Sequence, residues 1–158
     1  MKALFIGGTG NISTACSKLC LDKGMELYLL NRGQRVRKEL EGARILQADI
    51  NDAEQVKAQL KSLHFDVVVN FIAFKPEEVQ RDIDLFSGRC SQYLFISSAT
   101  VYQKPPTQSI ITESAPLRNP YWDYARDKIA CEELLMKAYR EQSFPVSIVR
   151  PSHTYETV

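Results

Sequence analysis

The strongest constraint on the fold of this chain is a repeated alternation of two kinds of segment. Short runs of apolar and β-branched residues occur at 3–7, 26–30, 43–47, 66–71, 92–97 and 146–150. Most of these runs are apolar almost throughout, which is typical of strands covered on both faces. Between them, apolar residues recur at helical spacing, as in 12–19, 53–60 and 131–138. The alternation predicts an α/β fold: a doubly wound parallel sheet of six strands with helices on both faces, where ligands bind beyond the carboxyl ends of the strands.

The size and charge of the chain narrow its class. With 158 residues, it is expected to form one domain, residues 1–158, that buries a core without disulfides or metal. A formal net charge of +1 gives no basic surplus for binding a nucleic-acid backbone. The apolar stretch in the N-terminal segment MKALFIGG is too short for a signal peptide or a membrane span. We therefore expect a cytoplasmic protein without a nucleic-acid or membrane partner.

The cysteines predict neither a metal site nor a disulfide. Cys16 and Cys20 are four residues apart on an apolar helix face, and neither they nor Cys90 and Cys131 form a C-x-x-C pair. Reduced cysteines in such positions act as small buried hydrophobic residues.

The segment GGTGNIS, Gly7 to Ser13, lies between the first predicted strand and the first predicted helix. It follows the pattern G-x-x-G-x-x-G except that Ser13 replaces the last glycine. Such glycines allow a tight turn and a close approach to a pyrophosphate, and the helix N-terminus offers unpaired N–H groups to the phosphates. We expect a phosphate-binding loop in which the Ser13 hydroxyl bonds back to the turn or helps cap the helix. The alternative is a plain glycine-rich turn without a ligand.

The end of the second strand bears on the choice of cofactor. Sites that prefer NAD usually carry an acid there, but this chain has Asn31 and Arg32. An arginine in that place can pair with a 2′-phosphate or stack on adenine, so NADP is slightly favoured over NAD. The alternative is that Arg32, Arg35 and Arg37 form a solvated basic turn, which leaves the cofactor open.

The third strand is followed by Asp49 and Ile50. The carboxylate is placed to accept from an adenine amino group while Ile50 packs on the ring. The alternative is that Asp49 is an ordinary helix cap.

A serine, a tyrosine and a lysine predict a catalytic site. The fifth strand ends at Ser97 and Ser98, and the segment YWDYARDK places Tyr124 and Lys128 four residues apart at a helix start. On a helix these two side chains share a face, which continues into the face that packs on the sheet. A nearby ammonium favours the phenolate of Tyr124 for acid-base work, and Ser98 can bond the substrate oxygen. The alternative is an amphipathic helix with a surface lysine.

Residues 103–120, QKPPTQSIITESAPLRNP, contain four prolines and no clear period. A long irregular stretch in a compact domain is more often functional than accidental. We expect this segment to contribute to function.

Together these motifs resemble the extended short-chain dehydrogenases/reductases, in particular the NAD-dependent epimerase/dehydratase family that acts on nucleotide sugars. The segment GGTGNIS resembles the glycine loop of that family, ADI its adenine contact and NFIAFK the end of its fourth strand. SSATVY resembles its serine motif, YARDK its tyrosine-lysine pair and RPSHTY its Arg-Pro segment. The chain departs from the family pattern at Ser13, Ile72 and Asp127, and it lacks a glycine after Tyr102 and Tyr155.

The resemblance implies a Rossmann-like NAD(P)-binding domain with Ser98, Tyr124 and Lys128 as its catalytic triad. The residues that it implies for cofactor binding are Gly7, Thr9, Gly10, Asn11, Ile12, Asn31, Arg32, Asp49, Ile50, Phe71, Ile72, Ala73, Lys75, Tyr124 and Lys128. Family members continue into a smaller C-terminal domain that holds the sugar nucleotide. A chain of this length therefore corresponds to the cofactor-binding part, with the substrate domain absent.

The expected function is that of an NAD(P)-dependent epimerase/dehydratase or reductase. Its substrate would be a nucleotide sugar or a related hydroxyl or keto compound, handled by tyrosine acid-base catalysis and hydride transfer. Two alternatives remain open: a non-catalytic NAD(P)-binding sensor or atypical family member, and an inactive cofactor-binding fragment. A homodimer is expected by analogy with the fold alone.

Overall fold

The structure is a computed structural model that describes residues 1–33 and 40–155. Each of the apolar runs predicted as strands forms one. The strands are β1 (Lys2–Ile6), β2 (Glu26–Asn31), β3 (Arg44–Gln47), β4 (Phe65–Asn70), β5 (Cys90–Ile96) and β6 (Val146–Val149). The helices are α1 (Asn11–Asp22), α2 (Ala53–Leu60), α3 (Pro76–Phe86) and α4 (Asp123–Gln142), with a short 3₁₀ turn, η2 (Ala99–Val101), after β5.

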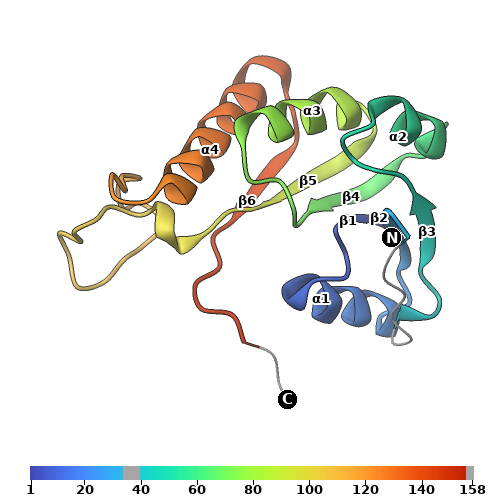
Figure 1. The fold of residues 1–158 in the computed structure, drawn as a ribbon, viewed down its shortest axis with the longest axis horizontal. Helices are drawn as coiled ribbons and strands as arrows, with labels where there is room; N and C mark the ends of the chain where they lie inside the picture. Colours follow the sequence, from blue (N-terminus) through green and yellow to red (C-terminus); the bar gives the residue numbers. More distant parts are fainter. Residues whose placement is uncertain (34–39, 156–158) are drawn as a thin grey trace.

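The strands form one parallel sheet in the order β3-β2-β1-β4-β5-β6. The chain starts in the middle of the sheet, winds to one edge through β2 and β3, and returns past β1 to build the other half. Helix α1 covers one face, and α2, α3 and α4 cover the other (Figure 1). The predicted doubly wound α/β fold is confirmed. Because the winding reverses between β1 and β4, a crevice is expected at their carboxyl ends.

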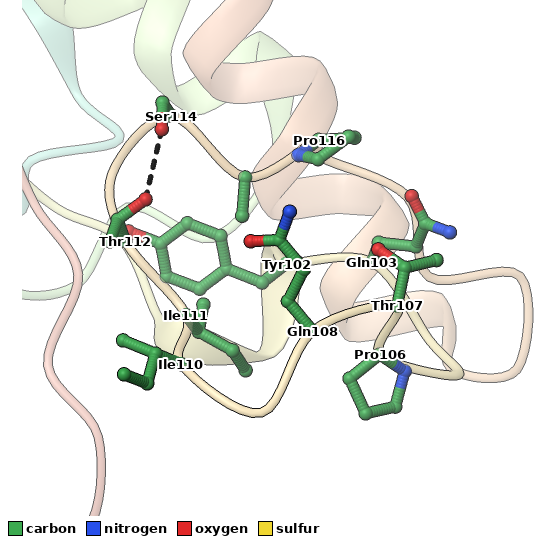
Figure 2. A pocket seen from close by; sticks show the side chains of 11 residues that line it. Tyr102, Gln103, Pro106, Thr107, Gln108, Ile110, Ile111, Thr112, Ser114 and Pro116 are labelled. Atoms are coloured by element: carbon green, nitrogen blue, oxygen red, sulfur yellow. Dashed lines mark hydrogen bonds between the residues drawn. The ribbon is translucent and has the colours of Figure 1, made fainter.

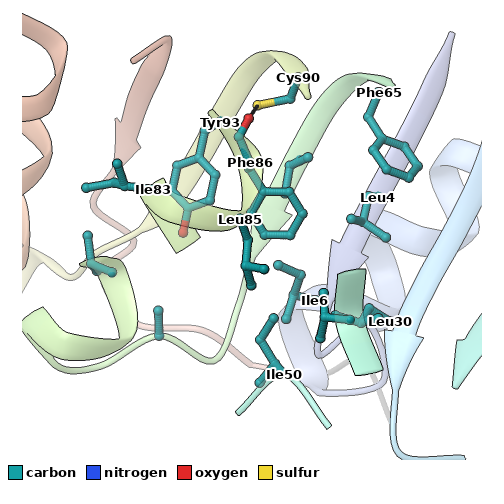
Figure 3. Close-up of a cluster of buried hydrophobic side chains, with 14 of the residues drawn as sticks. Leu4, Ile6, Leu30, Ile50, Phe65, Ile83, Leu85, Phe86, Cys90 and Tyr93 are labelled. Carbon is teal, nitrogen blue, oxygen red and sulfur yellow. Dashed lines mark hydrogen bonds between the residues drawn. The ribbon is translucent and has the colours of Figure 1, made fainter. Parts of the chain in front are cut away.

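Burial on both faces explains why the strands read as continuous apolar runs. In β1, Leu4 and Ile6 belong to the core under α2, α3 and α4, whereas Ala3 and Phe5 belong to the core under α1. Successive side chains of a strand point to opposite faces, so a strand between two helical layers needs apolar residues at every position. Figure 3 shows part of the larger core, where Phe86 of α3 lies near Leu4 and Ile6.

Helix α3 is not one of the helical segments named from the sequence. Its N-terminus carries Pro76 in the first turn, and the carboxylate of Glu78 accepts from the backbone N–H groups of Phe74 and Lys75 at 2.6 and 2.9 Å. Val79, Ile83 and Phe86 place apolar side chains at helical spacing against the sheet. A proline-acid start followed by this spacing is a helix signal that the sequence does contain.

The proline-rich segment 103–120 leaves and returns at neighbouring points. The backbone N–H of Gln103 donates to Pro116 O at 2.8 Å, and that of Arg118 donates to Val101 O at 3.0 Å. The segment is thus a compact loop with paired ends. It encloses a hollow of about 110 Å³ beside Tyr102 and Ile111 (Figure 2). Its expected contribution to function stays a prediction.

Candidate functional site

The glycine loop joins β1 to α1 in a tight turn that Ser13 holds together. The Ser13 hydroxyl is buried, donates to Gly7 O at 2.9 Å and accepts from the Gly10 N–H at 2.8 Å. The predicted bond from Ser13 to the preceding turn is confirmed. The serine in place of a third glycine therefore fastens the loop to the first turn of α1.

Two positions of this loop have no room for a side chain. Gly7 has a φ of +78°, and a Cβ there would lie 2.4 Å from Ile72 Cγ2. A Cβ at Gly8 would lie 2.6 Å from Leu29 Cδ2. These two glycines therefore let the loop pack closely against Ile72 and Leu29.

A hollow of about 440 Å³ opens at this edge, above the ends of β1, β2, β3 and β4. We call it the carboxyl-edge hollow. Its lining contains most of the predicted cofactor residues, namely Gly7, Thr9, Gly10, Asn31, Arg32, Asp49, Ile50 and Ile72, and also Asn51, which the sequence analysis did not single out. The segments that carry these residues are far apart in sequence, and the sheet brings them together.

Two alternatives from the sequence concern this edge: Asp49 as a helix cap, and a basic turn that includes Arg32. The structure decides the first of them. Helix α2 is capped by Asp52, whose carboxylate accepts from Gln55 N at 3.0 Å, so the alternative of Asp49 as the helix cap is wrong. Asp49 instead accepts from Asn51 N at 2.9 Å and lines the hollow. The alternative of a basic turn involves Arg35 and Arg37, which lie outside the described residues.

Lys128 is the most unusual residue near this edge. It is buried, with 1% of its surface exposed, and its ammonium donates to Ala73 O and to Ile96 O, both at 2.7 Å. The ammonium also lies 4.7 Å from the centre of the Phe74 ring and 4.5 Å from that of Phe95. Burial lowers the pKa of Lys128 from 10.5 to about 8. The alternative of a surface lysine is wrong.

This pKa makes the stability of the protein depend on pH. Between pH 8 and 10.5 the unfolded chain holds the Lys128 proton more tightly than the folded chain does, so the contribution of Lys128 to the unfolding free energy rises with pH. Relative to Lys128→Met, the wild type should gain roughly 1 kcal/mol per pH unit in this window. Urea denaturation of both proteins at several pH values measures the difference. A difference that does not vary with pH would contradict the shifted pKa.

Tyr124 lies one helical turn before Lys128 and is half-buried. The Lys128 ammonium is 5.9 Å from the centre of its ring. The Tyr124 ring also lies between Trp122 and Phe74, with ring centroids 5.0 and 6.3 Å away. The tyrosine and lysine thus share the inward face of α4, as predicted.

Ser98 stands at the end of β5, two residues after the carbonyl that Lys128 bonds. Its hydroxyl oxygen accepts from the Thr100 backbone N–H at 3.2 Å and from the Thr100 hydroxyl at 3.0 Å. Ser97 differs from its neighbour, since it is buried and donates to the carboxylate of Glu132. Of the two serines, Ser98 is the half-buried one, and it caps η2.

The remaining predicted cofactor residues do not line the hollow. Asn11 and Ile12 form the first turn of α1, and the Phe71 ring packs on Phe5 with centroids 5.2 Å apart. Ala73 is buried under Lys128, and Lys75 is the exposed cap of α3.

Sequence reasoning missed a buried ion pair beside the site. Glu132, one turn after Lys128 on α4, pairs with Arg150 at 2.6 Å. Arg150 also donates to the hydroxyl of Tyr102 at 3.1 Å. The hydrogen bond to Glu132, and to a smaller extent the bond to Tyr102, raises the pKa of Arg150. The pair ties α4 to the end of β6 and to the start of the proline-rich loop. In the sequence, the only sign is that Glu132 follows Lys128 by four residues, which places it on the same face of the helix.

Two further observations bear on the kind of site. Within residues 1–33 and 40–155, no group of three or more His, Cys, Asp or Glu side chains is arranged to hold a metal ion. No helix in the described part of the chain is long and apolar enough to cross a membrane.

A parallel sheet in this strand order, with a glycine turn after β1 and a hollow across its carboxyl edge, defines a Rossmann-like α/β protein. The family model described as the NAD dependent epimerase/dehydratase family matches residues 3–156. The chain belongs to this family, and the resemblance seen in its motifs is confirmed.

Solved structures with the same fold include enzymes of sugar-nucleotide chemistry. The UDP-Glc/GlcNAc 4-epimerase of Campylobacter jejuni is 23% identical, with a TM-score of 0.80 over 94% of this chain and 52% of its own. Pal from Bacillus thuringiensis is 23% identical, with a TM-score of 0.82 over 98% of this chain and 57% of its own. The dTDP-glucose 4,6-dehydratase of Bacillus anthracis, solved with NAD, is 18% identical, with a TM-score of 0.81 over 98% and 56%.

At these identities the likeness shows the fold alone. The chain spans about half the length of these structures. No curated protein matches it.

Proposed function

We propose that this chain forms the cofactor-binding part of an NAD(P)-dependent epimerase/dehydratase or reductase that acts on a nucleotide sugar or a related hydroxyl or keto compound. Its family membership supports an NAD-dependent enzyme of this general kind. The Campylobacter jejuni epimerase and the Bacillus anthracis dehydratase are named for UDP- and dTDP-sugars, which supports a nucleotide sugar as the substrate class.

One observation carries the proposal. The buried ammonium of Lys128 bonds Ala73 O, and the residue before Ala73, Ile72, lines the carboxyl-edge hollow. The tyrosine-lysine pair of α4 is thereby fixed next to the hollow that would hold a dinucleotide. The fit is supported by the glycine loop before α1, whose Gly7 and Gly10 line the hollow. Arg32 and Asp49 line it as well.

In the proposed site, each residue of the triad has a separate task. Tyr124 exchanges a proton with the substrate hydroxyl at its phenolic oxygen, and the ammonium of Lys128 lies 5.9 Å from the centre of its ring. Ser98 donates its hydroxyl proton to the reacting oxygen of the substrate, since both of its bonds within the described chain are accepted ones. The nicotinamide, when bound, supplies a hydride acceptor. Lys128 would also hold the ribose of the cofactor in this proposal.

Binding of the cofactor is the first test. Trp122 is the single tryptophan of the chain and its ring lies 5.0 Å from that of Tyr124, so its fluorescence reports on this end of the site. Titration with NADPH and NADH should give saturable energy transfer with at least one of them. No saturation with either would overturn the proposed function.

The exposed guanidinium of Arg32 at the hollow leads us to propose NADP over NAD. A charge-assisted bond to the 2′-phosphate should make NADPH bind roughly tenfold more tightly than NADH, and Arg32→Ala should remove the preference. Arg140→Ala, at an exposed arginine near the end of α4, is the matched control and should change neither affinity. Tighter binding of NADH by the wild type would mean that Arg32 does not read a 2′-phosphate.

A further inference from the structure

A buried carboxylate on α3 lies at the centre of a hydrogen-bond network that the proposed mechanism does not use. Asp82 has no exposed surface. One of its oxygens accepts from the Tyr93 hydroxyl at 2.6 Å and from the side-chain amide of Asn70. The other accepts from Nε and Nη2 of Arg81 at 3.2 and 3.0 Å. Both oxygens of the carboxylate therefore accept hydrogen bonds from buried or partly buried donors.

The network reaches the carboxyl-edge hollow along two arms, one through Arg81 and one through Asn70. Nη1 of Arg81 donates to Oδ1 of Asn51 at 2.6 Å, and Asn51 lines the hollow beside Asp49 and Ile50. On the other arm, Oδ1 of Asn70 accepts from the backbone N–H of Ile72 at 2.8 Å, and Ile72 lines the hollow against Gly7.

The two arms fix two loops that belong to different parts of the sheet. Asn51 follows β3, and Ile72 follows β4, so no ladder bond sets the distance between them. The side-chain amide of Asn70 donates to Asp82, and its oxygen is thereby turned toward Ile72 N. Asp82 thus sets the orientation of Asn70 and holds the guanidinium that reaches Asn51.

The carboxylate lies beside the apolar core. Two residues of the same helix, Ile83 and Phe86, belong to that core (Figure 3). Burial raises the pKa of Asp82, while Arg81 and the donors from Tyr93 and Asn70 lower it. Apolar replacement of a buried charge network is often neutral or stabilising, so such a network suggests a role other than stability.

We propose that Asp82 and Arg81 are positioning residues of the nucleotide site, which hold the loops after β3 and β4 at the spacing that the cofactor requires. The inference rests on the proposed function, because it assigns a supporting network to the same site. Neither side chain lines the hollow, so both act through Asn51 and Ile72.

Three variants on α3 test the inference. Asp82→Asn keeps the volume but removes the charge and an acceptor, and Arg81→Met removes the bond to Asn51 from a side chain that is 16% exposed. Both should weaken NADPH and NADH binding by roughly tenfold, the equivalent of a lost hydrogen bond to a charged group. Ile83→Ala, which creates a cavity on the same helix without touching the network, is the matched control and should leave the affinity of the folded protein unchanged.

A second readout separates positioning from general loosening. Hydrogen exchange of the Ile72 amide should speed up in Asp82→Asn and not in Ile83→Ala, when both are measured where they are equally folded. Equal affinity in all three variants, or equal exchange at Ile72, would overturn the inference while the proposed function stands. A wild type that binds neither nucleotide would overturn the proposed function and this inference with it. If Asp82→Asn does not fold, the affinity of Arg81→Met decides.

Discussion

Tyr124→Phe is expected to lower kcat by about 10²–10⁴-fold and to leave the affinity for the cofactor nearly unchanged. The substitution removes only the phenolic oxygen that would exchange the substrate proton. The ring stays between Trp122 and Phe74, so the packing at the start of α4 is kept. Turnover is measured in the protein that contains this chain, with UDP- and dTDP-sugars as substrates, and cofactor affinity is measured by fluorescence titration.

Tyr139→Phe is the matched control for this experiment. Tyr139 lies on the same helix but is exposed, and it takes no part in the site. Its variant should turn over at the wild-type rate. A Tyr124→Phe protein with full kcat would show that the phenol does not transfer the proton, whereas a loss of cofactor binding would assign the tyrosine a binding role.

Glu132→Ala is expected to lower the unfolding free energy by about 3 kcal/mol, which is near the lower end for breaking a buried ion pair. The substitution leaves the guanidinium of Arg150 without its carboxylate and the buried hydroxyl of Ser97 without its acceptor. Arg150 keeps 19% of its side chain exposed, so water offsets part of the loss. Urea denaturation at pH 7 gives the difference.

The double variant Glu132→Leu with Arg150→Met is the control for the charge itself. It removes both partners and fills their space with apolar groups, so it should recover most of the lost stability. If the double variant is as unstable as Glu132→Ala, the unpaired arginine is not the cause of the lost stability. If Glu132→Ala is as stable as the wild type, the ion pair contributes nothing to the folded state.

The sheet was predictable because its signal is local. A strand buried on both faces must be apolar at nearly every position, and runs such as 3–7 and 66–71 meet that requirement within a few residues. Helix α3 was not named from the sequence, although Pro76, Glu77 and Glu78 begin it and its apolar residues at 79, 83 and 86 follow helical spacing.

The sequence by itself determined the α/β class, the glycine turn after β1 and the shared face of Tyr124 and Lys128, since each depends on neighbours within a few residues. Tertiary structure alone decided which polar groups are buried. Lys128 bonds carbonyls 55 and 32 residues away, and Ser97 meets Glu132 across 35 residues. Asp82 of α3 accepts hydrogen bonds from Asn70 in β4 and from Tyr93 in β5. A charge is stable in a core only when distant donors or acceptors converge on it, and that convergence exists only once the sheet has formed.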